Sequence, residues 1–255
     1  MSNLSHTIRR FNRFELKYVL TLQQAERFRQ SLRAYLVPDD NGDAQGGYQL
    51  TSLYYDSPDY RCFWEKVDGL RLRRKLRIRH YETANPLADD TTVFVEIKQR
   101  IDRVTQKRRV VLPYRAALQL CNQREVPDDH APQDQPVIDE IQAFLWQYNL
   151  QPSSLVRYRR QALMGTEYDI GLRVTFDTDL CFQAGTAALH ADLTSLPLFP
   201  ANCVVMEIKV NERIPYWLTE LVAQHNLNMV RISKYCRSIE LSQNLPSTRW
   251  HLAAV

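Results

Sequence analysis

The sequence predicts an α+β fold: a large antiparallel β-sheet that closes into a barrel, with helices packed on its outside. Three observations lead to this prediction. Several segments alternate apolar and charged residues with the period of a strand, two of them meet at a tight turn near Asp102, and the segments between them carry apolar stripes with helical spacing. Because we find no internal repeat and no dividing linker, we expect a single domain at residues 10–241, with tails at residues 1–9 and 242–255.

The individual elements follow from the same patterns. The predicted strands are Phe14–Leu20, Tyr48–Tyr55, Leu70–Tyr81, Thr92–Ile101, Arg103–Leu112, Leu155–Met164, Gly171–Asp177 and Cys203–Val210. Helices are predicted from Thr21 to about Tyr35, from Ser57 to Val67, from Pro113, and over Val137–Tyr148, Ile214–His225 and Arg231–Leu241. Thr21 and Gln24 have the spacing of a capping box at the start of the first helix.

The composition excludes several other classes of protein. The chain has 255 residues and a formal net charge of +4, which alone does not indicate a nucleic-acid binder. Its five cysteines are an odd number and none stands in a C-x-x-C pair, so we expect no disulfide framework, no zinc site and a reducing compartment. We see no signal segment, no membrane span and no P-loop sequence, and we expect a cytoplasmic protein.

The strongest pattern lies in the segment Leu70–Arg79. Successive side chains of a strand point to opposite faces, so its odd-numbered positions share one face. These positions are Arg71, Arg73, Lys75, Arg77 and Arg79, while the opposite face is apolar except for Arg74. Like charges about 6–7 Å apart along a strand repel one another. The row is therefore costly unless an anion lies across it.

Other predicted strands repeat this arrangement of cations opposite apolar residues. The charged positions are Glu15 and Lys17, Glu96 and Lys98, Arg157 and Arg159, Arg173, and Glu207 and Lys209. The simpler interpretation is a sheet with one face on a core and one face in water, which is common for antiparallel sheets. The excess of Arg and Lys favours closure instead, because a closed barrel encloses the charged face and removes exposed edges.

A bore lined by Arg and Lys suits a linear polyphosphate or a nucleoside triphosphate, because guanidinium groups donate in pairs to phosphate oxygens. Glu207 and Glu96 are our candidate ligands for a divalent metal, with Glu96 the less favoured of the two. The alternative is that each carboxylate pairs with a neighbouring cation.

An ordered set of motifs in this chain resembles the VTC domain, the polyphosphate polymerase branch of the triphosphate tunnel metalloenzymes (CYTH-like superfamily). The motifs are FELKY at 14–18, SLYYD at 52–56, LRIRHY at 76–81, VEIK at 95–98, VRYRR at 156–160, LRVTFD at 172–177, MEIK at 206–209 and SKY at 233–235. Each motif alone is weak, whereas the set in this order is specific.

The resemblance implies an eight-stranded tunnel that binds ATP and inorganic polyphosphate or triphosphate with Mn²⁺ or Mg²⁺. It implies a phosphotransferase that moves the γ-phosphoryl group of ATP onto a growing polyphosphate chain. The implied phosphate-binding residues are Lys17, Arg77, Arg79, Lys98, Arg157, Arg159, Arg173, Lys209 and Lys234. Of these, Arg77, Arg79, Lys98, Arg173 and Lys209 are the candidate catalytic residues, and Glu207 is the implied metal ligand.

Two departures from related patterns refine this prediction. Tunnel triphosphatases usually begin with two glutamates and a lysine on the first strand, but Arg13 occupies the first of those positions here. This favours the VTC branch. Eukaryotic VTC proteins also add an SPX domain and membrane helices, which we do not see, so we do not expect coupled translocation.

The alternatives are a triphosphate or polyphosphate hydrolase on the same fold and a non-catalytic polyphosphate-binding module. RNA binding would call for aromatic residues interleaved with the basic strands, so we expect no nucleic-acid partner. The sequence does not predict the oligomeric state.

Overall fold

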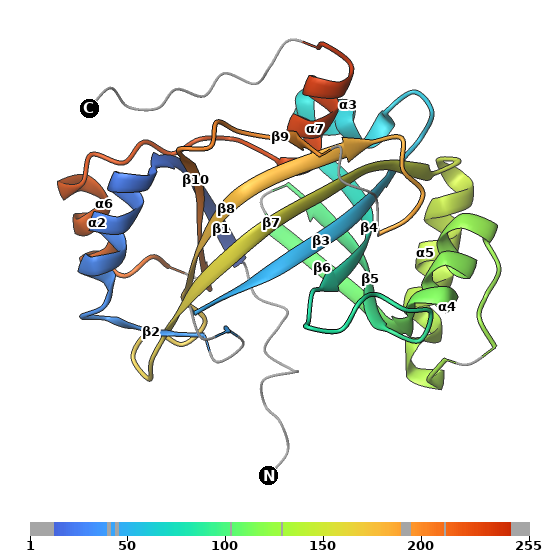
Figure 1. Cartoon of the computed structure of the whole chain (residues 1–255), viewed down its shortest axis with the longest axis horizontal. Coiled ribbons are helices and arrows are strands. Elements are labelled where there is room, and N and C mark those ends of the chain that lie inside the picture. The colour runs from blue at the N-terminus through green and yellow to red at the C-terminus, as the bar shows by residue number, and fades with distance from the viewer. Residues whose placement is uncertain are drawn as a thin grey trace.

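The computed structural model describes residues 13–39, 42–43, 46–102, 104–128, 130–189, 195–211 and 213–245 (Figure 1). The predicted tail at residues 1–9, and residues 246–255 of the second tail, lie outside this description. No helix in the described part of the chain has the length and apolar character needed to cross a membrane.

The strands are β1 (Arg13–Thr21), β2 (Leu36–Pro38), β3 (Gly47–Asp56), β4 (Leu72–Tyr81), β5 (Thr92–Ile101), β6 (Val104–Pro113), β7 (Gln151–Gly165), β8 (Arg173–Ala184), β9 (Leu196–Pro197) and β10 (Cys203–Asn211). The helices are α2 (Leu22–Leu32), α3 (Arg61–Val67), α4 (Tyr114–Leu118), α5 (Gln135–Gln147), α6 (Tyr216–Gln224) and α7 (Lys234–Ser242). A π-helical turn, Gln119–Gln123, follows α4, and a 3₁₀ turn, Pro132–Asp134, precedes α5.

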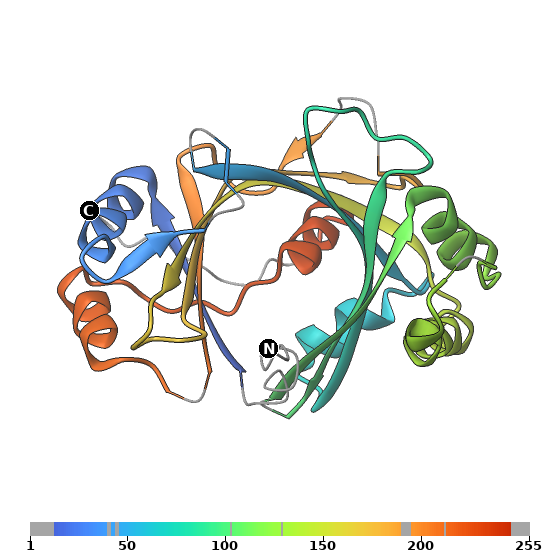
Figure 2. The same ribbon diagram turned by 90° about the horizontal axis from the view of Figure 1, so that it is seen from below.

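The strands form one antiparallel sheet that curls strongly upon itself. Its main path runs β1-β10-β8-β7-β3-β4-β5-β6, with β2 paired to β7 and β9 paired to β8 at the side. Viewed from below, the sheet bends around a central space (Figure 2). The prediction of an α+β fold with a large antiparallel sheet is confirmed.

The prediction that the barrel closes is wrong. The terminal strands β1 and β6 share no backbone ladder in the described residues, so the sheet is a half-barrel with a seam. The edge strand β6 carries three consecutive cations, Lys107, Arg108 and Arg109, and charged edge strands resist pairing. Alternation predicts which face turns inward, but it does not specify whether the last two edges meet.

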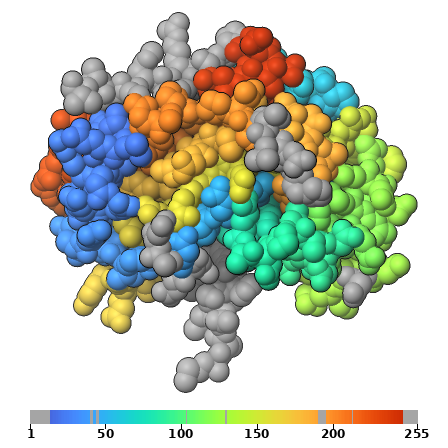
Figure 3. Space-filling view, in the orientation of Figure 1, coloured from blue at the N-terminus to red at the C-terminus, as the bar shows by residue number. Residues whose placement is uncertain are grey.

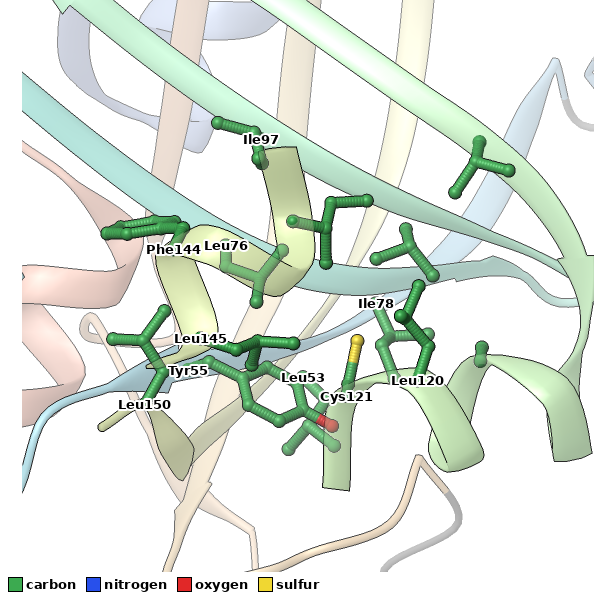
Figure 4. Close-up of a cluster of buried hydrophobic side chains, with 14 of the residues drawn as sticks. Leu53, Tyr55, Leu76, Ile78, Ile97, Leu120, Cys121, Phe144, Leu145 and Leu150 are labelled. Carbon is green, nitrogen blue, oxygen red and sulfur yellow. The ribbon is translucent and has the colours of Figure 1, made fainter. Parts of the chain in front are cut away.

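Two separate groups of helices cover apolar parts of the convex face of the sheet (Figure 1). On one side, α2 and α6 cover β1, β10 and β8, where Phe28, Leu32 and Leu218 are fully buried. On the other side, α4 and α5 cover β3 to β6, and Phe144 and Leu145 pack against Leu76 and Ile97 (Figure 4). The apolar positions predicted from alternation therefore form the outer cores.

The concave face is filled at one end by a third apolar cluster. Helix α7 lies inside the curve of the sheet (Figure 2), and its Tyr235 and Ile239 pack against Val156, Phe182 and Val205. The alternation had suggested a bore lined by charged residues along the whole interior. Instead, this apolar cluster fills one end of it. The charged part of the concave face lies beside this plug.

Hydrogen bonding explains one difference from the predicted boundaries, and apolar packing explains another. Helix α3 begins at Arg61 rather than at Ser57 because the buried Asp56 carboxylate accepts from the backbone N–H groups of Cys62 and Phe63, while Tyr60 adopts a left-handed φ of 57°. Strand β8 continues beyond Asp177 because Leu180 and Phe182 reach the cluster around α7. The predicted capping box of Thr21 and Gln24 is present.

Replacing Phe144 by alanine tests the outer core beneath α5. Its ring is fully buried, so Phe144→Ala should lower the free energy of unfolding by about 3–5 kcal/mol, because a cavity replaces its contacts. Trp146 on the same helix is 61% exposed, so Trp146→Ala should cost about 1 kcal/mol or less. Urea denaturation measures both, and equal losses would contradict this assignment of the core.

Candidate functional site

Cations from most strands of the sheet point onto its concave face. The ladders place Arg77 of β4 opposite Glu96 of β5, Arg79 opposite Phe94, and Lys75 opposite Lys98. On the other half of the sheet, Lys17 of β1 lies opposite Glu207 of β10. Helix α7 adds Lys234 from inside the curve. Register alone therefore brings together side chains that are far apart in the sequence.

Glu207 is the centre of the first ion-pair cluster. Its carboxylate lies 2.8 Å from Lys209 Nζ, 2.9 Å from Lys234 Nζ and 3.6 Å from Lys17 Nζ. Burial alone would raise the pKa of Glu207, but these lysines hold it well below its ordinary value. The same burial lowers the pKa of Lys209 to about 8, although Glu207 opposes the shift.

Glu15 continues this cluster toward the seam of the half-barrel. Its carboxylate lies 2.7 Å from Lys98 Nζ of β5, and 3.7 and 4.0 Å from the Nζ atoms of Lys17 and Lys209. The Lys98 contact joins the edge strand β1 to β5, the neighbour of the other edge strand β6, by side chains where the backbones do not pair. Burial opposes ionisation of Glu15, but the lysines outweigh it and lower its pKa.

Asp177 is the most deeply buried carboxylate of the site. It accepts two hydrogen bonds from the Arg160 guanidinium, at 2.6 and 2.7 Å, and lies 2.5 Å from Lys234 Nζ. A paired, two-point contact of this kind is strong because both partners are charged and shielded from water. It fixes Arg160 and Lys234 in place on the concave face.

Glu96 forms a second centre on the other half of the sheet. Arg77 donates to it at 2.6 and 2.9 Å, and Lys107 of β6 lies at 2.9 Å. Burial lowers the pKa of Lys107 to about 8, with Glu96 acting in the opposite direction. The Tyr54 hydroxyl accepts from Arg77 at 3.0 Å. Burial raises its pKa, but Arg77 and Arg79 lower it to about 8 overall.

Two buried or half-buried cations of the site lack a carboxylate partner among the described residues. Arg79, only 7% exposed, donates to the hydroxyls of Ser52 and Tyr158, both at 3.2 Å. Lys75 lies 2.7 Å from Ser233 Oγ and 3.2 Å from Cys236 Sγ. A buried charge without a counter-ion is costly, so these two positions indicate where an anion would be stabilised.

Most of the predicted site residues converge on this face. Those that lie on it are Lys17, Arg77, Arg79, Glu96, Lys98, Arg173, Glu207, Lys209 and Lys234. Arg173 lies at the rim, where it donates to Asp39 and to the Tyr48 hydroxyl, both at 2.7 Å.

The structure does not bring Arg157 and Arg159 to this face. They lie on the convex side of β7, paired with Glu82 at 2.6 Å and Asp43 at 2.8 Å. This side of β7 reaches the surface between the two groups of helices (Figure 3). We had assigned the wrong face of β7: Arg157 and Arg159 share one face and Arg160 lies on the other, and we had taken the face with two arginines as the inner one. The inward residues are Tyr158 and Arg160.

Sequence reasoning missed several residues of the site. These are Arg160, Asp177, Lys107 and Tyr54. Lys75 was placed in the cationic row of its strand but not in the assigned phosphate-binding set. The apolar residues of β7 carried the signal for Arg160. Val156 lies on the inner face and Leu163 on the outer face. Arg160 is four positions from Val156 and therefore shares the inner face. Asp177 shares a face with Arg173, and that shared face was its signal.

The family model described as the VTC domain matches residues 12–243. The chain belongs to the VTC domain family. Its ordered motifs predicted this membership, and the prediction is confirmed. The match spans every strand of the curled sheet, and only residues 1–11 and 244–255 of the chain lie outside it.

Two solved structures are similar to this VTC domain in fold. A "putative adenylate cyclase" from Bacillus halodurans gives a TM-score of 0.51 at 11% identity, covering 87% of this chain and 95% of that one. A "putative adenylyl cyclase" from Hippeastrum, described as having a dominant triphosphatase activity, gives 0.50 at 14% identity and covers 93% and 100%. At these identities the likeness concerns the fold alone. A search of curated proteins found no match.

The described carboxylates of this VTC domain are not clustered in the way that a preformed metal-binding site requires. Within the described ranges, no three Asp, Glu, His or Cys side chains gather as a metal site. Glu207 and Glu15 are instead linked through two shared lysines, Lys17 and Lys209. The predicted metal ligands Glu207 and Glu96 thus both have cationic partners in this structure.

The depressed pKa values predict that anion binding weakens in mild alkali. Lys209 and Lys107 lose protons, and Tyr54 becomes anionic, as the pH rises through about 8. We expect the affinity for inorganic tripolyphosphate to fall about ten-fold between pH 7 and pH 9, because contacts to charged groups are lost. Calorimetry at constant ionic strength measures this. Lys209→Arg stays charged and should lose less, and equal affinity of the wild type at both pH values would contradict the assignment.

Proposed function

We propose that this VTC domain binds ATP and inorganic polyphosphate on its concave face and transfers the γ-phosphoryl group of ATP to the end of the polyphosphate chain. The observation that supports this most is Arg79, a buried guanidinium whose partners are two hydroxyls. It lies beside Arg77, in a site where cations outnumber carboxylates. Only a ligand with several closely spaced negative charges relieves that excess.

The first group of cations comprises Arg77, Arg79, Lys98, Arg173 and Lys209. Arg77, Lys98 and Lys209 each contact a carboxylate, and Arg79 and Arg173 contact the hydroxyls of Tyr158 and Tyr48. We assign this group to the transferring phosphates. Lys17 and Lys234 contact Glu207, and we assign them to the chain beyond. Guanidinium groups match phosphate oxygens in pairs, whereas ammonium groups act as point charges.

The reaction needs no side-chain nucleophile. A terminal oxygen of the polyphosphate chain forms a bond to the γ-phosphorus, and the bond from that phosphorus to the β,γ-bridging oxygen breaks. ADP leaves with that oxygen, and the polyphosphate gains one unit. The acceptor oxygen is already ionised, so the protein's task is to align both chains and to neutralise the charge that develops on the transferring group.

A divalent ion fits this site only together with its phosphate ligand. Mg²⁺ is commonly held by one or two carboxylates plus phosphate oxygens and water, and Glu207 and Glu15 lie close enough to share the same lysines. Glu207 is the residue that we expect to hold Mn²⁺ or Mg²⁺, with Glu96 as the less favoured alternative. When bound, the ion would neutralise charge on the phosphate oxygens.

Triphosphate hydrolysis is the second candidate function. The similar fold from Hippeastrum is described as having a dominant triphosphatase activity, and a water molecule in place of the acceptor oxygen would give that outcome on the same site. The two reactions differ only in the acceptor, so their products distinguish them.

Incubation with ATP and Mn²⁺ separates these functions. We expect polymer that lengthens with time on a sizing gel, together with ADP in equal amount to the phosphate incorporated. Orthophosphate or pyrophosphate without polymer would support hydrolysis instead. Absence of any turnover, with polyphosphate still bound, would favour a binding module and contradict the proposal.

Glu207→Gln tests the metal assignment. The amide keeps the size of the side chain but removes its negative charge, so we expect turnover to fall at least 100-fold, because the ion would lose its protein ligand. Polyphosphate should bind as tightly as before or more tightly, since Lys209 and Lys234 are released from Glu207. Turnover near the wild-type rate would exclude Glu207 as the ligand.

Arg79→Gln and Arg157→Gln form a matched pair on opposite faces of the sheet. Removing the inward guanidinium should weaken tripolyphosphate binding about 10-fold or more, the loss of a charged contact, and should flatten its dependence on salt. Arg157 is half-exposed on the convex side and pairs with Glu82, so its replacement should leave binding within two-fold. Equal effects of both changes would place the anion elsewhere.

A further inference from the structure

A row of aromatic side chains lies at one end of the concave face. Tyr48, Tyr81 and Phe94 come from three neighbouring strands, with ring centroids 5.8 and 5.5 Å apart along the row. The Arg109 guanidinium of β6 lies over the Phe94 ring, 4.9 Å from its centroid. Basic and aromatic groups are therefore interleaved here, an arrangement that the sequence analysis did not find.

This row lies at the end of the sheet away from α7. Lys75 contacts the first turn of α7, and Tyr81 lies six residues further along β4, or roughly 20 Å. Helix α7 thus occupies one end of the concave face, and the aromatic row lies toward the other. The apolar cluster around α7 extends between them, because it includes Tyr48 and packs against Tyr81.

These rings are not part of the outer cores. Val93 and Val95, the neighbours of Phe94 in sequence, are fully buried on the convex face, whereas Phe94 and Tyr81 are half-exposed on the concave face and Arg109 is exposed. Among the described residues nothing hydrogen-bonds to the Tyr81 hydroxyl or pairs with Arg109 through a carboxylate. The row is therefore accessible to a ligand, and the Tyr81 hydroxyl and the Arg109 guanidinium are available to bind it.

The row is continuous with the proposed phosphate site. Phe94 pairs directly with Arg79 across the β4–β5 ladder, and Arg109 pairs with Glu96 across the β5–β6 ladder. Directly opposed side chains of an antiparallel pair have their Cβ atoms about 4.5–5.5 Å apart. A planar group that stacks on Phe94 therefore has a phosphate attached to it within reach of Arg79.

The geometry points to a nucleobase subsite made by Phe94, Tyr81 and Arg109, which binds the base of a nucleoside triphosphate while its phosphates extend along Arg79 and Arg77. This inference rests on the proposed function and specifies which residues bind the base of its nucleotide donor. Stacking on a ring face or a guanidinium does not read the edge of the base. The subsite therefore accepts any base, with purines favoured for their larger surface.

Calorimetric binding of ATP and of inorganic tripolyphosphate to Phe94→Leu tests this subsite. Leucine keeps an apolar side chain but removes the ring, so ATP should bind about five-fold or more weakly, the usual loss of one stacked base. Tripolyphosphate should bind within two-fold of its wild-type affinity. Tyr81→Leu provides a second variant, and Trp64→Leu, which removes an exposed ring on α3, should change neither ligand.

The other outcomes are distinct. If Phe94→Leu and Tyr81→Leu weaken both ligands equally, the rings support the phosphate site and hold no base, which overturns the inference. If neither variant changes ATP binding, the subsite is absent although the proposed function stands. If the wild type binds neither ATP nor tripolyphosphate, the proposed function fails and this inference fails with it.

Discussion

Mutual repulsion between cations on one concave face is the constraint on which this structure depends. Strands β1, β10, β8, β7, β4, β5 and β6 each turn at least one Lys or Arg inward, and a helix adds Lys234. The carboxylates Glu15, Glu96, Asp177 and Glu207 each contact at least two of these cations and so hold the array together. They do not neutralise it, and the remaining positive charge is the basis of the proposed binding of polyanions to this face.

The rest of the fold makes this charged interior possible. A sheet with one charged face must bury its other face, and two separate groups of helices cover it. Helix α7 and its apolar cluster exclude water from one end of the interior, which strengthens every ion pair beside it. The same helix supplies Lys234. The closed end, the charged centre and the aromatic end then follow one another along the face.

Alternation along the strands was enough to predict most of the site. A strict period of two fixes the inward face of β4, β5, β10 and of β8 as far as Asp177, so residues such as Arg77, Lys98 and Lys209 were placed on the correct face. It was not enough for β7, because Arg157 and Arg159 share one face and Arg160 lies on the other, so the cations alone do not identify the inward face. Beyond Asp177 a bulge in β8 also changes the parity of that strand, which the period does not predict. Closure of the barrel was also mispredicted. The alternation of residues along a strand shows which face is buried, but it does not show whether the two edge strands β1 and β6 pair with each other.

The most direct test of the central claim is the melting temperature of the protein as inorganic tripolyphosphate is added. A ligand that binds only the folded state stabilises it by about 2.7 kcal/mol at one hundred times its Kd. We predict a rise of several degrees that saturates with tripolyphosphate, and a much smaller rise with sulfate at the same ionic strength. A melting temperature that does not move, or that moves equally with both anions, would contradict the account.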